Sequence, residues 1–187
     1  GVAAGSGGAT PSGYIAAGQA FFVEALSGGS VNFTNSMRVT GNNTQFFKTA
    51  KKSSGVITNR LWLNMTNEEG YFKQILLGYV PNATDRIDRG YDSKTASGND
   101  YFTFYSINKS GTDPIKLAIQ GKSLPFDYGD EISLGFKTSS LAKNKIEIDH
   151  YEGAYEKINI YLEDKLTGVV HNLKLGPYEF DSAIGTF

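Results

Sequence analysis

The sequence contains no cysteine. Disulfide bonds, thiolate nucleophiles and cysteine-ligated zinc are therefore excluded. This absence does not fix the compartment, because it fits a Gram-negative surface protein as well as a cytosolic one. No apolar run approaches the roughly 20 residues that a membrane-spanning helix needs. We therefore expect no membrane insertion.

An excess of charge of either sign is also lacking. The 18 basic and 19 acidic residues give a formal net charge of −1. Without a global field, the chain would not be steered to nucleic acid or to anionic lipid. We expect no nucleic-acid partner.

Catalytic motifs are scarce as well. The only two histidines are His150 and His171. His171 shares a strand register with Val169 and Leu173, which favours a structural role. His150 lies beside Asp149 at an expected strand end, as in any acidic turn. We find no G-x-S-x-G, HExxH, Walker or GxGxxG pattern, so we expect no enzymatic activity and no catalytic residue in this chain.

An initiator methionine and a signal peptide are missing too, because the chain begins GVAAGSGG. We expect a fragment or processed piece of a longer protein. The polar connector at 48–58 is the best internal boundary. It separates residues 1–50, an N-terminal β-segment expected to be the end of a cut domain, from a domain at 51–187.

What the chain does contain is strand material. It has 22 Gly, 11 Tyr and 12 Phe, short apolar runs and frequent turn residues, and it lacks a convincing 3.6-residue apolar stripe. The pattern predicts an all-β protein, an antiparallel two-sheet β-sandwich like a jelly roll, with two small β-subdomains as an alternative. The expected strands lie at 14–26, 31–39, 60–66, 71–80, 101–107, 115–120, 131–137 and 145–149, and in a hairpin at 158–180.

The last hairpin is the most regular signal. Ile158, Ile160 and Leu162 alternate with polar residues, which predicts a strand with one buried face. The turn at 164–168 ends in Gly168, which can adopt positive φ.

The central hairpin suggests a binding face. Pairing 60–66 with 71–80 across the 67–70 loop would place Thr66 opposite Tyr71 and Asn64 opposite Lys73. Trp62, Asn64, Tyr71 and Lys73 would then share one polar face, as in a carbohydrate-binding site where a ring stacks on a sugar. The alternative is that a second layer covers this face and makes Trp62 part of the core.

The long loop at 81–100 is rich in oxygen ligands. Calcium prefers such ligands, so this loop is a candidate calcium site. The spacing does not match an EF-hand, and Arg86 and Arg89 interleave with the acids, so charge pairing is the favoured interpretation. The candidate ligands are Asp85, Asp88, Asp92, Asn99 and Asp100.

Several stretches resemble one family. They are GYIAAGQAFFVEA at 13–25, VNFTNSMRVTGNNTQFFK at 31–48, RLWLNMTNEEGYFKQILLGYV at 60–80, ATDRIDRGYDSK at 83–94, AIQGKSLPF at 118–126 and NIYLEDKLTGVVHNL at 159–173. In order and spacing they resemble the C-terminal β-rich region of Bacteroidetes, especially flavobacterial, surface proteins exported by the type IX secretion system. The GNPY segment and the C-terminal sorting strand of such proteins are not found here. The sequence at 181–183 also resembles a short Bacteroidetes O-glycosylation motif, with Ser182 as acceptor.

The resemblance implies a secreted or cell-surface β-domain that meets the type IX machinery during export, and it names no ligand. We therefore expect a non-catalytic structural or adhesion module, whose partner would be a polysaccharide or another surface protein. The alternative is a carbohydrate-binding module of a secreted polysaccharide-degrading enzyme. A minor third hypothesis is a hydrolase whose site the motifs do not reveal. We expect no cofactor, with calcium as the one alternative.

Overall fold

The structure is a computed structural model that describes residues 13–15, 26–40, 58–95 and 101–187. The chain divides into two compact units. One comprises residues 1–3 and 7–53, and the other comprises residues 4–6 and 54–187. The two units are described separately below.

In the N-terminal unit, a short 3-10 helix, η1 (Asn35–Met37), interrupts the run expected to be a strand at 31–39. The strand prediction is wrong there, and Val31 and Phe33 are exposed. Backbone hydrogen bonds close the turn, from the N–H of Met37 to the carbonyl of Thr34 and from the N–H of Arg38 to the carbonyl of Asn35, each at 3.1 Å. The strand expected at 14–26 lies mostly outside the described residues.

The C-terminal unit consists mainly of strands, and the all-β prediction is confirmed. Among its described residues, the helical ones form two short 3-10 helices, η2 (Gly153–Lys157) and η3 (Leu173–Leu175). None of the helices within the described ranges is long and apolar enough to cross a membrane. The strands are β1 (Asn59–Asn67), β2 (Phe72–Tyr79), β3 (Ser93–Lys94), β4 (Phe102–Asn108), β5 (Ile115–Lys122), β6 (Leu134–Thr138), β7 (Lys143–Glu152), β8 (Tyr161–Asp164), β9 (Val169–Asn172), β10 (Tyr178–Asp181) and β11 (Gly185–Thr186).

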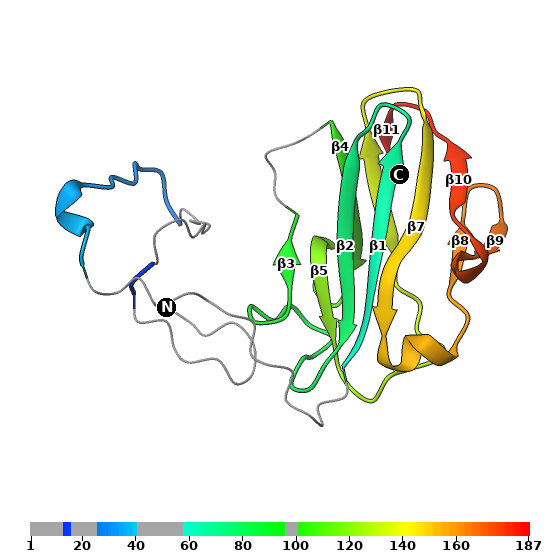
Figure 1. The fold of residues 1–187 in the computed structure, drawn as a ribbon, viewed down its shortest axis with the longest axis horizontal. Coiled ribbons are helices and arrows are strands. Elements are labelled where there is room, and N and C mark those ends of the chain that lie inside the picture. Colours follow the sequence, from blue (N-terminus) through cyan, green and yellow to red (C-terminus); the bar gives the residue numbers. More distant parts are fainter. Residues whose placement is uncertain (1–12, 16–25, 41–57, 96–100) are drawn as a thin grey trace. The chain divides into compact units, whose positions relative to one another are not determined.

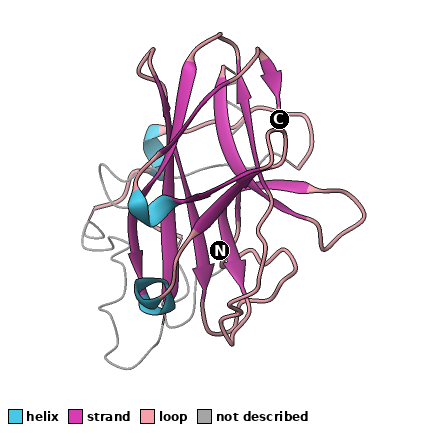
Figure 2. Ribbon diagram, turned by 90° about the vertical axis from the view of Figure 1, so that its right-hand side faces the viewer, coloured by secondary structure: helices cyan, strands magenta, loops and turns pink. Residues whose placement is uncertain are grey.

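Nine of these strands form one curled sheet in the order β10-β7-β1-β2-β5-β4-β6-β11, with β3 paired to β5 (Figures 1 and 2). β8 and β9 form a separate two-stranded sheet. The sheet is mixed, because β2 and β5 run parallel. The expectation of a purely antiparallel fold is therefore wrong at this pair, and the jelly-roll sandwich stays a prediction.

The curl brings the two ends of the large sheet together. The ring centroids of Phe136 in β6 and Phe180 in β10 lie 5.3 Å apart, although these strands stand near opposite ends of the strand order. Phe187 stacks on Phe136 at 5.0 Å, and Tyr178 stacks on Phe180 at 5.5 Å. Aromatic side chains therefore join the ends over the core.

The core lies inside the curl and follows the strand period. In β1, Leu61, Leu63 and Met65 are buried while the alternate residues are half-buried. Phe102 and Ile75 belong to the same cluster. Burying one such side chain stabilises the fold by about 1.5–3 kcal/mol, so this inward face accounts for the pairing of β1 with its neighbours.

The C-terminal hairpin packs on the same core, as its alternation predicted. Ile160 is buried, and Ile158 and Leu162 lie against the cluster. Gly168 has φ +73°, and the carboxylate of Asp164 accepts hydrogen bonds from the N–H groups of the following turn. The predicted strand begins later than expected, at Tyr161.

Candidate functional site

The outer face of β7, β1 and β2 carries the first candidate site. Trp62 points away from the core and is half-buried. Its ring stacks on His150, with centroids 3.8 Å apart and planes 17° apart. The guanidinium carbon of Arg60 lies 5.3 Å from the Trp62 centroid. Trp62 is therefore placed on the sheet face that the sequence predicted, opposite Leu61 and Leu63.

A β-bulge organises the polar groups beside this stack. Trp62 pairs with His150 and Leu63 with Ile148, which leaves Asp149 unpaired. The Asp149 carboxylate lies 2.5 Å from His150 Nδ1 and 3.4 Å from Asn64 Nδ2. Both hydrogen bonds lower the pKa of Asp149, and the one from His150 has the larger effect. The bulge thus turns two consecutive polar side chains onto one face.

The predicted register of the central hairpin is wrong by one residue. Thr66 pairs with Phe72, and Lys73 pairs with the buried Met65. A shift of one residue moves a side chain to the other face of the sheet. Tyr71 accordingly stacks on the core residue Phe102, at 5.7 Å.

The four predicted ligand-binding residues are therefore split. Trp62 and Asn64 share the outer face, where Gln74 donates to Asn64 Oδ1 at 2.8 Å. Tyr71 and Lys73 belong to the other face. Sugar binding by Trp62 and Asn64 stays a prediction.

In the described part of the long loop, residues 81–95, the carboxylates accept hydrogen bonds from backbone N–H groups. Asp88 accepts from the N–H of Thr84 at 2.6 Å. Asp92 accepts from the N–H groups of Asp88 at 2.7 Å and Gly121 at 2.8 Å. Burial raises the pKa of Asp92, although the two N–H groups oppose this. These carboxylates hold the loop against β5.

The sequence favours ion pairs between the carboxylates of this loop and its two arginines. Across the described residues, neither Arg86 nor Arg89 forms an ion pair with a loop carboxylate. The residues that the structure describes also contain no group of three or more His, Cys, Asp or Glu side chains placed to hold a metal ion. Asn99 and Asp100 lie outside the described residues. Calcium binding at the loop stays an untested alternative.

Two other predicted residues have structural partners. The Ser182 hydroxyl accepts a hydrogen bond from Asn144 Nδ2 at 2.8 Å, and its glycosylation stays a prediction. His171 Nε2 lies 3.0 Å from the carbonyl oxygen of Gly176. This contact fits the structural role expected for His171.

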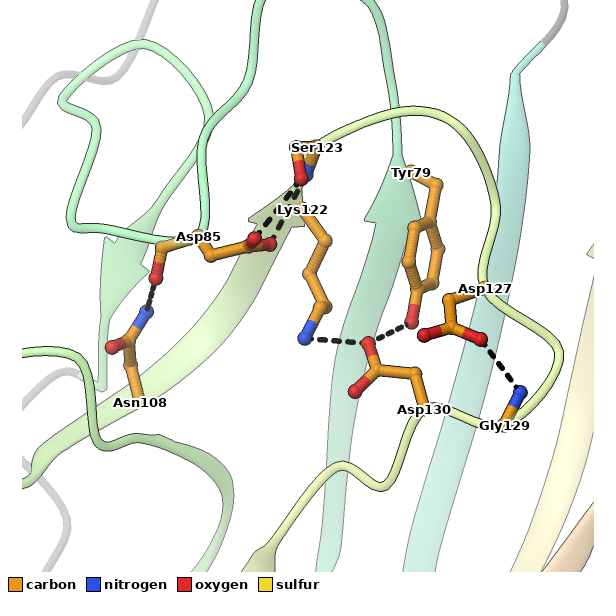
Figure 3. A network of polar contacts seen from close by, with 8 residues as sticks. All are labelled: Tyr79, Asp85, Asn108, Lys122, Ser123, Asp127, Gly129 and Asp130. Carbon is orange, nitrogen blue, oxygen red and sulfur yellow. Dashed lines mark hydrogen bonds and ion pairs between the residues drawn. The ribbon is translucent and has the colours of Figure 1, made fainter.

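A second candidate site was not found from the sequence. Asp130 accepts a hydrogen bond from the hydroxyl of Tyr79 and lies 2.5 Å from Lys122 Nζ (Figure 3). Tyr79 ends β2 and Lys122 ends β5, so the parallel pairing of these strands brings the two side chains together. The sequence had indicated only a turn at Asp130, 51 residues from Tyr79.

Tyr79 is buried among aromatic side chains. Tyr79 is 3% exposed, and the ring of Phe126 meets it edge-on at 4.7 Å. Burial, and then the hydrogen bond to Asp130, raise the pKa of the Tyr79 hydroxyl. The pKa of Tyr155 is raised in the same way by burial and by the charge of Asp130. Tyr79 therefore serves as a neutral donor to Asp130.

Asp85 connects this cluster to the acidic loop. Its carboxylate accepts from the Ser123 hydroxyl at 3.0 Å, and its carbonyl oxygen accepts from Asn108 Nδ2 at 3.2 Å. A hollow of about 450 Å³ opens between these groups. It is lined by Tyr79, Asp85, Lys122, Ser123, Pro125, Phe126, Asp127 and Asp130.

Comparison with known proteins gives one match. No curated protein and no solved structure matches the chain. A family model described as "Domain of unknown function (DUF8693)" matches residues 2–187, almost the whole length. The chain therefore belongs to the family of domains of unknown function DUF8693.

Proposed function

We propose that the chain is a non-catalytic adhesion module of a secreted, cell-surface protein exported by the type IX system. The observation that carries the adhesion role is the outer face of β7, β1 and β2. There Trp62, His150, Asn64 and Gln74 are ordered by stacking and hydrogen bonds rather than left as independent surface side chains. Such preorganisation lowers the entropic cost of binding a partner.

The carboxylates near the candidate sites support the non-catalytic part of the proposal. Asp130 is held by Tyr79 and Lys122, and Asp149 is held by His150 and Asn64. Tyr79 and Lys122 both contact Oδ2 of Asp130, whereas His150 and Asn64 contact the two oxygens of Asp149, so a structural partner accounts for the position of each carboxylate. The secreted location rests on the sequence resemblance, and immunolabelling of intact cells that express the protein would test it.

A second candidate, a carbohydrate-binding module, is favoured by the chemistry of the same face. The aromatic ring of Trp62 stands beside amide and carboxylate groups that can bond sugar hydroxyls. His150 stacks on the ring and the Arg60 guanidinium also lies over it, so a sugar would bond the polar neighbours or stack on the part of the ring that these two side chains leave open. The partner of the adhesion module would then be a polysaccharide.

Both candidates are tested by Trp62→Ala. We expect this substitution to reduce retention of the chain on its surface or polysaccharide partner without unfolding it, because Trp62 lies outside the core. Tyr161→Ala is a matched control, since it removes an aromatic ring that is 61% exposed on β8. Equal retention by wild type and Trp62→Ala would reject the outer face as the binding surface.

A further inference from the structure

His150 lies on the outer face of the sheet with one of its two ring nitrogens open to gain a proton. Its side chain is 55% exposed, and its Nδ1 atom lies 2.5 Å from the Asp149 carboxylate. A carboxylate only accepts hydrogen bonds, so Nδ1 carries the proton of the neutral imidazole. The second nitrogen, Nε2, has no hydrogen-bond partner among the described residues. Protonation therefore takes place at Nε2, on the exposed side of the ring.

The charge of this part of the face depends on that proton. Between pH 5 and 8, histidine is the side chain that ordinarily changes its charge. Asp149 stays a carboxylate in this range, because the hydrogen bond from His150, and to a smaller extent that from Asn64, lower its pKa. The imidazole thus changes between a neutral and a charged partner of a constant anion.

The remaining charged side chains around His150 are engaged elsewhere. They are Arg60 with Glu152, Lys145 with Glu147, and Lys174, whose amine lies over the ring of Tyr151. On this face β2 places only uncharged side chains, Phe72, Gln74 and Leu76, next to β1. Within the described ranges, Asp149 is therefore the one charged group in hydrogen-bond or ion-pair contact with the imidazole.

Protonation strengthens the contacts that order this face. The rings of His150 and Trp62 lie 3.8 Å apart with their planes at 17°, so an imidazolium would rest against the π-face of the indole. A cation in that position is attracted to the ring. The same proton converts the hydrogen bond with Asp149 into an ion pair, which is the stronger contact. Asp149 is also bonded to Asn64, so the stack and its polar neighbours are stabilised together.

We propose that protonation of His150 regulates the outer face, which holds its partner more tightly below about pH 6 than above about pH 7. This inference rests on the proposed function, because it concerns the same face. Affinity can improve only by the factor by which the ordered conformer gains population. For a cation–π contact at an exposed site, that factor is about two to five.

The fluorescence of Trp62 tests the switch without any partner. Trp62 is the only tryptophan of the chain, and His150 and His171 are the only histidines. We expect the emission of Trp62 to titrate between pH 5 and 8, because a charged imidazole in contact with an indole alters its emission. His150→Gln should abolish this titration, and Asp149→Asn should move it to lower pH by removing the anion.

His171→Gln is the matched control. His171 lies in β9, where its Nε2 atom is 3.0 Å from the carbonyl oxygen of Gly176, and glutamine can still donate to that oxygen. The control should keep the titration of wild type. A titration that persists in His150→Gln, or no titration in wild type, would overturn the proposal.

Retention of the chain on intact bacterial cells and on a polysaccharide array, at pH 5.5 and pH 7.5, tests the effect on binding. Wild type should be held about two- to fivefold more tightly at the lower pH, whereas His150→Gln should be held equally at both. Equal retention of wild type at the two pH values would reject the regulation and leave the proposed function standing. Absence of retention at either pH would reject both, even if the fluorescence of Trp62 still titrates.

Discussion

The coupling of Tyr79, Asp130 and Lys122 can be measured through stability. Asp130→Ala removes the acceptor of a buried hydroxyl, which costs about 1–3 kcal/mol. It also leaves the amine of Lys122, whose side chain is 17% exposed, without its ion-pair partner. Because the lysine still reaches solvent, this second cost lies below the 3–5 kcal/mol of a fully buried pair. We expect a total loss of about 3 kcal/mol in the free energy of unfolding.

Lys122→Met separates the two contributions. It keeps the apolar stem and leaves Asp130 bonded to Tyr79, so we expect a loss of about 1 kcal/mol. In the double variant no amine is stranded, and the loss should be at least about 1 kcal/mol smaller than the sum of the single losses. Urea unfolding, followed by the fluorescence of the single tryptophan, Trp62, would give all four values. Losses that add to within about 0.4 kcal/mol would refute the coupling.

Three further predictions use the same chain. The pKa of the Tyr79 hydroxyl is raised in the folded chain, whereas in the unfolded chain it has its ordinary value of 10.0. The contribution of Tyr79 to stability is therefore full below pH 10.0 and falls as the pH rises above it. Thermal melting against pH should show a shallower alkaline decline in Tyr79→Phe, and identical slopes would contradict this assignment. Gly153→Ala should lower the free energy of unfolding, measured in urea, by about 3 kcal/mol. The reason is that φ at this residue is +71° and an added Cβ would lie 2.4 Å from the carbonyl oxygen of Thr58. Unchanged stability would be inconsistent with that backbone conformation. Because Asp88 and Asp92 already accept backbone N–H groups, we expect millimolar calcium to leave the melting temperature unchanged, whereas a rise that Asp88→Asn removes would establish a calcium site.

Local pattern was sufficient to predict much of the secondary structure. The alternation around Leu61 and Leu63 identified β1, and the alternation at Ile158 and Ile160 identified the buried side of the last hairpin. Both patterns depend only on neighbouring residues and the two-residue strand period. The face of Trp62 could be predicted for the same reason.

Long-range pairing could not be predicted. Lys122 meets Tyr79 because β2 and β5 run parallel, and nothing local to either strand encodes that choice of partner. The error at Tyr71 had a smaller cause, since one extra loop residue changed the hairpin register and with it the face. The Tyr79–Asp130–Lys122 cluster therefore became visible only in three dimensions.

The pairing of β1 with β7 has a consequence for how the chain folds. Asn67 pairs with Asn144, so the chain between them must close into one large loop before that edge of β1 is covered. Contacts of such sequence separation slow folding, typically to milliseconds or seconds. A nascent chain that ends before β7 would expose the apolar side chains Leu61, Leu63 and Met65. The C-terminal unit should therefore remain open to chaperones until its later strands have emerged.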